Sequence, residues 1–103
     1  MEVVRVAVGS IVDFQDGDFR PLRIQGLSVL VGMVRNRYFA ISNACPHAGS
    51  LLERGSLNGE ELTCPRHGAV INVLDGRCVV PEGLPQVPCY QIEVDSGRLY
   101  VTV

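Results

Sequence analysis

The sequence predicts an all-β fold, an antiparallel β-sandwich or small barrel, on three observations. Short runs rich in Val, Ile, Leu and Tyr recur along the whole chain. Turn-forming Asp-Gly, Asn-Gly and Ser-Gly pairs lie between these runs, as they do between antiparallel strands. No window of about eleven residues has a clean 3.6-residue hydrophobic period, so no long helix is expected. Short strands joined by close turns favour packed sheets or a small barrel.

The expected strands follow from the apolar runs in chain order. They lie at residues 3–8, 21–24, 27–34, 38–42, 62–64, 70–74, 78–80, 90–94 and 99–103. The turn-forming pairs between them are Asp16-Gly17, Asn58-Gly59, Asp75-Gly76 and Ser96-Gly97.

Two segments interrupt the strand pattern. Residues 10–14 (SIVDF) allow one short helical turn and no more. Residues 81–88 (PEGLPQVP) contain three prolines, which lack the amide donors that an inner strand needs. We therefore expect this second segment to be a loop.

The size of the chain indicates one domain spanning residues 1–103. At 103 residues it lies near the lower limit for an independent core, so a bound cofactor would add to its stability. The formal net charge of -2 gives no basic excess to attract nucleic acid or an anionic membrane. We expect neither as a partner, and expect a monomer in isolation.

Hydropathy indicates a cytoplasmic protein. The longest apolar run, residues 27–34, is far shorter than the roughly 20 residues that cross a bilayer. The N-terminal MEVVRVAV lacks the basic start and long apolar centre of a signal peptide. In a reducing compartment, cysteines arranged in a pattern indicate metal binding or catalysis rather than a disulfide framework.

Cysteine and histidine form one pattern, C-x-H-x16-C-x2-H. It consists of Cys45, His47, Cys64 and His67, and it contains both histidines of the chain. Each half supplies one thiolate and one imidazole. The usual zinc finger groups its two Cys and its two His separately, with the His pair on a helix. A tetrahedral zinc held by these four side chains remains an alternative.

The pattern resembles the Rieske iron–sulfur domain. A proline follows each cysteine, Gly68 follows the second histidine, and the proline-bearing segment 81–88 comes next, in the order of that family. The resemblance covers essentially the whole chain. It implies two hairpin loops, about residues 43–50 and 62–69, that hold one [2Fe-2S] cluster, with the proline loop covering it.

The resemblance also divides the four ligands between the two irons. It implies that Cys45 and Cys64 bind the inner iron, and that His47 and His67 bind the outer one near the surface. Replacing two thiolates by neutral imidazoles removes negative charge and raises the potential above that of an all-cysteine site. No catalytic residue is expected, because beyond the four ligands the sequence offers no nucleophile, base or second metal site.

The implied function is electron transfer rather than catalysis. By resemblance the protein is a Rieske-type ferredoxin that accepts one electron from a flavin-containing reductase and delivers it to a terminal oxygenase, a ring-hydroxylating dioxygenase. Two alternatives stay open. One is a small subunit of an assimilatory nitrite reductase, which shares the fold, and the other is a zinc-stabilised binding module without a redox role.

Residues around the ligands predict a low reduction potential. High-potential members carry an extra cysteine in each loop and Ser and Tyr hydrogen-bond donors after the second histidine. The equivalent positions here are Ser50, Arg66, Ala69 and Ile71. All four features are missing, so we expect a potential toward the low end of the Rieske range of about -150 to +300 mV.

Three further side chains have simpler interpretations. Cys78 and Cys89 lie in apolar, strand-like context and are expected to be small buried residues, with a mutual disulfide as the lesser option. Arg66, between two ligands, is either a solvated loop charge or a contact for an acidic partner.

Overall fold

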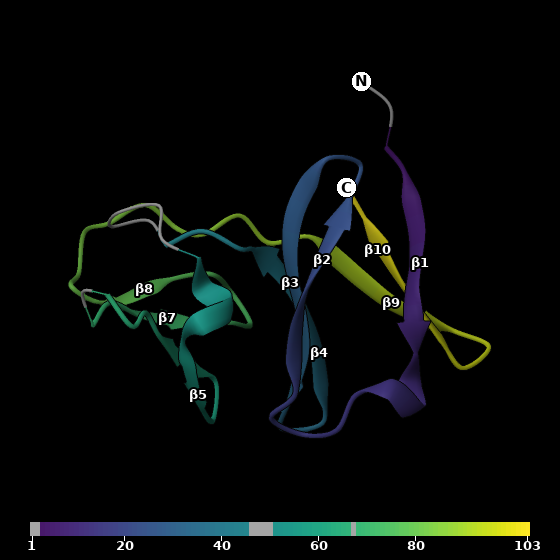
Figure 1. The fold of residues 1–103 in the computed structure, drawn as a ribbon, viewed down its shortest axis with the longest axis horizontal. Coiled ribbons are helices and arrows are strands. Elements are labelled where there is room, and N and C mark those ends of the chain that lie inside the picture. The colour runs from purple at the N-terminus through teal and green to yellow at the C-terminus, as the bar shows by residue number, and fades with distance from the viewer. Residues whose placement is uncertain (1–2, 46–50, 67) are drawn as a thin grey trace.

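The structure is a computed structural model that describes residues 3–45, 51–66 and 68–103. In this part of the chain, the strands form three antiparallel sheets, and short 3-10 helices lie between some of the strands (Figure 1). The strands are β1 (Arg5–Ser10), β2 (Phe19–Ile24), β3 (Leu27–Val34), β4 (Arg37–Ser42), β5 (Ser56–Asn58), β6 (Glu61–Thr63), β7 (Val70–Asn72), β8 (Cys78–Val80), β9 (Gln91–Asp95) and β10 (Arg98–Thr102). The 3-10 helices are η1 (Ile11–Asp13) and η2 (Leu52–Arg54).

The three sheets follow one another across the molecule (Figure 1). Strands β2-β3-β4 form the central sheet, with β1-β10-β9 on one side and β5-β6-β7-β8 on the other. We call the sheet β1-β10-β9 the base, and the sheet β5-β6-β7-β8 with its loops the cluster-binding subdomain. These open sheets confirm the all-β antiparallel prediction, but within the described residues they do not close into the small barrel that was its alternative form.

The central sheet packs apolar side chains on both of its faces. Side chains alternate along a strand, so neighbours on β3 point to opposite faces. Val29 and Val31 belong to the core under the base, whereas Leu30 and Val34 belong to the core under the cluster-binding subdomain. This double burial explains why β3 reads as a continuous apolar run rather than an alternating one.

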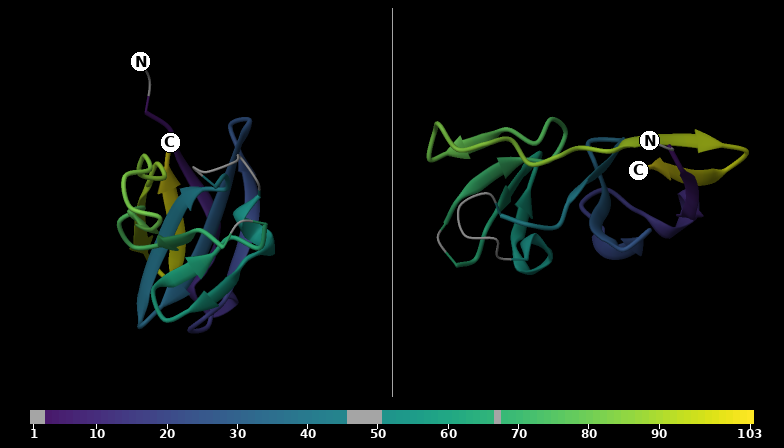
Figure 2. Two further views of the ribbon diagram at one scale, coloured as in Figure 1. Left: turned by 90° about the vertical axis from the view of Figure 1, so that its left-hand side faces the viewer. Right: turned by 90° about the horizontal axis from the view of Figure 1, so that it is seen from above.

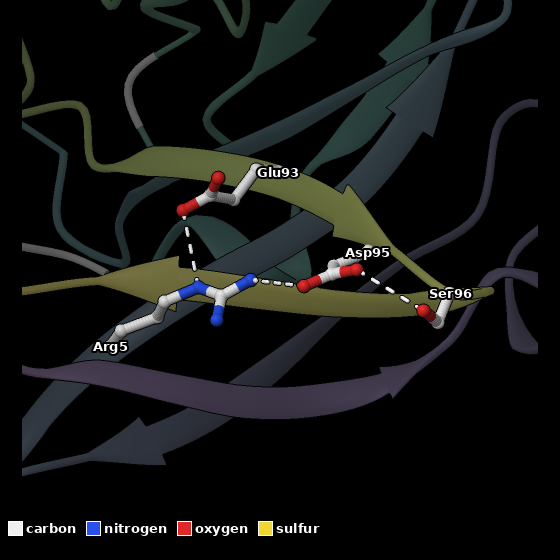
Figure 3. A network of polar contacts seen from close by, with 4 residues as sticks. All are labelled: Arg5, Glu93, Asp95 and Ser96. Carbon is white, nitrogen blue, oxygen red and sulfur yellow. Dashed lines mark hydrogen bonds and ion pairs between the residues drawn. The ribbon is translucent and has the colours of Figure 1, made fainter.

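An exposed ion-pair network joins the outer strands of the base (Figure 3). On β1, Arg5 contacts Glu93 and Asp95 of β9 at 3.2 Å each, and its guanidinium lies 3.8 Å from the centre of the Tyr100 ring on β10. The hydrogen bond to Asp95 is the main reason that the pKa of Arg5 is raised. Because these groups are exposed to solvent, the network contributes little to stability.

Most predicted elements are confirmed within a residue or two. Strands β3 and β8 have the predicted bounds, residues 81–88 form a loop, and the short turn at residues 10–14 is η1. Ser10 caps η1: its Oγ accepts from the Val12 amide at 3.4 Å, and its own amide donates to Asp13 at 2.9 Å. The elements not predicted are β5 and η2. Within the described residues, no helix is long and apolar enough to cross a membrane.

Candidate metal centre

The structure brings two of the four predicted ligands, Cys45 and Cys64, into one buried core. Cys45 comes three residues after β4 and is 2% exposed, and Cys64 directly follows β6 and is fully buried. Both belong to the apolar cluster that also contains Leu52 and Ile71. The other two predicted ligands, His47 and His67, lie outside the described residues.

The second predicted loop is the tip of the β6–β7 hairpin. Thr63 pairs with Val70, and beyond this pair the Cys64 amide donates to the Ala69 carbonyl at 2.7 Å. The Gly68 amide donates back to the Cys64 carbonyl at 3.0 Å, with Gly68 in the left-handed region at a φ of 71°. These bonds hold the backbone of Cys64 in a tight turn.

The start of the first predicted loop, residues 43–45, contains a buried asparagine contact that the sequence interpretation missed. Asn43 is 2% exposed, and its Nδ2 donates to Glu53 Oε1 at 2.9 Å and to Ser28 Oγ at 3.2 Å. In return the Glu53 amide donates to Asn43 Oδ1 at 2.9 Å. Asn43 therefore ties the chain just before Cys45 to η2. An amide side chain two residues before a predicted ligand, in a largely apolar stretch, was the available signal.

The proline-bearing segment 81–88 is a loop fastened at both ends. The Cys78 thiol donates to the Pro81 carbonyl at 3.2 Å at its start, and the Ser42 amide donates to the Pro88 carbonyl at 2.9 Å at its end. The Val87 amide also donates to the Gly76 carbonyl at 2.8 Å. A Cβ on Gly76 would lie 2.1 Å from the Val87 carbonyl oxygen, so this close approach requires glycine.

After this loop, the chain passes from the cluster-binding subdomain back to the base. Figure 2 shows this connection in the view from above, running along the length of the molecule from β8 to β9. Cys89 lies on it and forms an isolated bridge with Ile41 of β4. The proline loop is thus held between β8 and the central sheet.

The two remaining cysteines differ from each other. Cys78 is buried, as expected, but Cys89 is exposed, which corrects the expectation of a buried residue there. Cys89 pairs with Ile41 through a single bridge at the edge of the central sheet. Although the residue is exposed overall, partial desolvation of its thiol and then the Asp75 carboxylate raise the pKa of Cys89, which lowers its thiolate fraction. The two cysteines form no disulfide.

Comparison with known proteins then identifies the family. The model of the Rieske [2Fe-2S] domain matches residues 4–91. The chain belongs to the Rieske family. It carries one Rieske-type [2Fe-2S] cluster and is a Rieske ferredoxin-like electron carrier.

Among curated relatives, two of very different length illustrate the family. Ferredoxin CarAc of Metapseudomonas resinovorans is 30% identical over 98% of this chain and 95% of its own length. Human apoptosis-inducing factor 3 is 28% identical over 97% of this chain, which spans only 16% of that longer protein. The Rieske domain therefore occurs both as a small ferredoxin and as part of a larger chain.

Among solved structures, two bear on the functional alternatives. A complex of reduced oxygenase and oxidised ferredoxin in carbazole 1,9a-dioxygenase matches with a TM-score of 0.86 and 28% identity, over 94% of this chain and 91% of that one. A nitrite reductase small subunit from Mycobacterium tuberculosis matches with a TM-score of 0.86 over 100% of this chain and 97% of that one. At 19% identity, the second shows the fold alone.

The described residues of this Rieske protein fit a [2Fe-2S] cluster. Two cysteines, Cys45 and Cys64, lie in one apolar core, an environment in which thiolate anions neutralise iron charge away from water. The described residues contain no group of three or more potential metal-binding side chains.

The environment of the second loop in this Rieske protein is apolar. Ala69 and Ile71, which occupy the positions of the two hydroxyl donors in high-potential members, are both buried. Neither side chain can donate a hydrogen bond to a sulfur. The low potential expected from the sequence stays a prediction, and these two apolar side chains support it.

Proposed function

We propose that this protein shuttles single electrons from a flavin-containing reductase to a terminal oxygenase, in particular a ring-hydroxylating dioxygenase. In this proposal Cys45 and Cys64 bind the inner iron of the cluster, and His47 and His67 bind the outer iron. The chain acts as one domain over residues 1–103, with cluster-binding loops at 43–50 and 62–69 and the covering loop at 81–88. The bound cluster supplies reversible one-electron chemistry.

The shared burial of Cys45 and Cys64 is the observation that carries the ligand assignment. The Asn43 hydrogen bonds hold the chain two residues before Cys45, and the Ala69 carbonyl accepts from the Cys64 amide, so both proposed ligands lie on anchored backbone. Preorganised ligands lower the reorganisation that accompanies each electron transfer. Two ferric ions, two sulfides and two thiolates are together neutral, so one electron leaves only one net negative charge to accommodate.

The relatives support the assignment to an oxygenase system. CarAc is named as a ferredoxin, and the similarity to this chain extends over nearly the whole length of CarAc. The carbazole 1,9a-dioxygenase structure pairs a ferredoxin with its oxygenase. The likeness to the nitrite reductase small subunit supports only the shared fold, so it gives the second function no comparable support.

A reconstituted electron-transfer chain tests this proposal. The protein is reduced by a flavin-containing reductase with NADH, and the bleaching of its red-brown colour is followed in a stopped-flow spectrometer. The reduced protein is then mixed with a terminal oxygenase of the carbazole-dioxygenase type, and product formation is measured. We expect turnover that requires all three proteins.

Two results would contradict the proposal in different ways. A colourless protein that contains zinc and no acid-labile sulfide would establish the binding-module alternative. A coloured protein that supports nitrite reduction by a nitrite reductase large subunit, but no oxygenase turnover, would establish the small-subunit alternative.

A further inference from the structure

A surface depression beside the second cysteine loop is lined by two arginines and two apolar side chains. Within the described residues these are Leu51, Arg54, Pro65 and Arg66. All four are exposed, and Leu51 is 44% exposed although it is a large apolar residue. Arg66 lies between Cys64 and His67 in the sequence, so the depression adjoins the proposed outer edge of the cluster.

The two arginines of this depression carry unpaired positive charge. Among the described residues, ion pairs form at Arg5 and Arg35, but none forms at Arg54 or Arg66. Among the described residues, the neighbouring Glu53 forms no ion pair with Arg54, and its carboxylate accepts a hydrogen bond from the buried Asn43 at 2.9 Å. The patch is therefore positive on a chain whose formal net charge is -2.

We infer that this patch, Leu51, Arg54, Pro65 and Arg66, docks a redox partner protein whose surface carries carboxylates around an apolar side chain. The inference rests on the proposed electron-carrier function and names the chemistry of the partner. An apolar centre with charged residues at its edge is the usual composition of a transient interface. Opposite charges steer the encounter and fix its orientation, so the cluster edge next to Arg66 faces the partner.

Small inorganic oxidants of opposite charge test this inference on the intact holoprotein. The dithionite-reduced protein is oxidised in separate experiments by ferricyanide, an anion, and by hexaamminecobalt(III), a cation. One electron leaves the cluster and reduces iron(III) to iron(II) in ferricyanide, or cobalt(III) to cobalt(II). The rate constants are measured from low to high ionic strength.

The direction of the salt effect shows whether the oxidants respond to the charge of the patch or to the net charge of the whole protein. A protein that behaved according to its net charge of -2 would repel ferricyanide, and added salt would accelerate the reaction. We expect the opposite: salt slows oxidation by ferricyanide and speeds oxidation by hexaamminecobalt(III). Because salt screens charge, this sign does not depend on the reduction potential of the cluster.

Matched variants locate the charge. The double variant Arg54→Gln/Arg66→Gln should lower the ferricyanide rate at low salt by a factor on the order of 3 to 10 and reverse its salt dependence. The control Arg37→Gln/Arg98→Gln removes the same charge from exposed positions on β4 and β10, outside the depression. It should leave both the rate and its salt dependence nearly unchanged.

The outcomes distinguish failure of the docking inference from failure of the proposed function. A protein that cannot be reduced and reoxidised at all would overturn the electron-carrier function and the docking inference with it. A protein that cycles normally, but whose ferricyanide oxidation is accelerated by salt, would overturn the docking inference alone. Equal effects of the two double variants would also overturn it.

Discussion

The two faces of the central sheet are completed in different ways. On the base side, Val29, Val31 and Ala40 pack with Leu99 and Val101, which belong to a strand of five residues in a regular ladder. On the other side, the core includes Cys45 and Cys64 and is covered by a sheet whose four strands have three residues each. Strands this short make few ladder hydrogen bonds.

This difference indicates which part of the molecule depends on the cluster. The base has long paired strands and a core of ordinary hydrophobic residues, so it can hold itself together. In the cluster-binding subdomain, the proposed ligands Cys45 and Cys64 occupy part of the core. The free energy of cluster binding therefore becomes part of the folding free energy of this subdomain. We therefore expect the two sides to respond differently to loss of the metal.

The largest effect is expected from removing one thiolate. Cys64→Ala should abolish the visible absorbance of the cluster and speed hydrogen exchange in residues 51–72, while residues 98–103 stay protected. Cys78→Ala is the matched control, because Cys78 is buried in the same core but is not a proposed ligand. It should keep the full spectrum. Equal loss of colour in both variants would refute the distinction between ligand and core cysteine.

A smaller effect is expected at the residue that ties the first loop to η2. Asn43→Leu leaves the Glu53 amide without its acceptor, and should lower the free energy of unfolding by about 2 kcal/mol. Chemical denaturation of the holoprotein measures this change. The control Ser28→Ala removes only the 3.2 Å bond from Asn43 and should cost less. A larger loss in the control would place the important contact of Asn43 at Ser28 rather than at Glu53.

The next prediction compares the same substitution in the two cores that lie on either side of the central sheet. The wild-type potential should lie toward the low end of about -150 to +300 mV. Ala69→Ser adds a hydroxyl donor beside the second loop, and a hydrogen bond of about 1 kcal/mol would raise the potential by about 40 mV. Ala40→Ser, in the core under the base, should leave it unchanged. Redox titration measures all three potentials, and a wild-type value near +300 mV would contradict this prediction.

The smallest effect is expected in the ion-pair network of the base. Arg5→Met removes both exposed contacts, to Glu93 and Asp95, together with the stacking on Tyr100. It should lower the unfolding temperature only slightly, and it should leave the visible spectrum and the potential unchanged. Thermal unfolding followed by circular dichroism measures the first quantity. A shift in potential would mean that the base and the cluster are electrostatically coupled.

The sequence predicted those parts of the fold in which local chemistry decides the structure. Apolar runs and glycine turns marked β3 and β8 correctly, and prolines marked the loop at residues 81–88. Strand β5 was missed because the pattern Ser-Leu-Asn is too short and too polar to be distinguished from a turn. It is formed by pairing with β6, which is a tertiary effect.

The same limit applies to the candidate site. The spacing of the cysteines and histidines identified the family and predicts the four ligands, because cluster chemistry restricts residue types strongly. It did not reveal the buried contact between Asn43 and Glu53, which joins residues ten positions apart. Nor did it reveal that Cys89 is exposed, because exposure of a small apolar side chain depends on which segments pack over it.

The most direct test of the ligand assignment uses the fact that the chain contains only two histidines. The protein is produced with 15N-labelled histidine, reduced, and studied by pulsed electron paramagnetic resonance for nitrogen nuclei coupled to the cluster. We predict two histidine nitrogen couplings in the wild type and one in a His67→Cys variant that retains its cluster. A reduced cluster without any histidine coupling, or one whose couplings are unchanged by the substitution, would contradict the assignment.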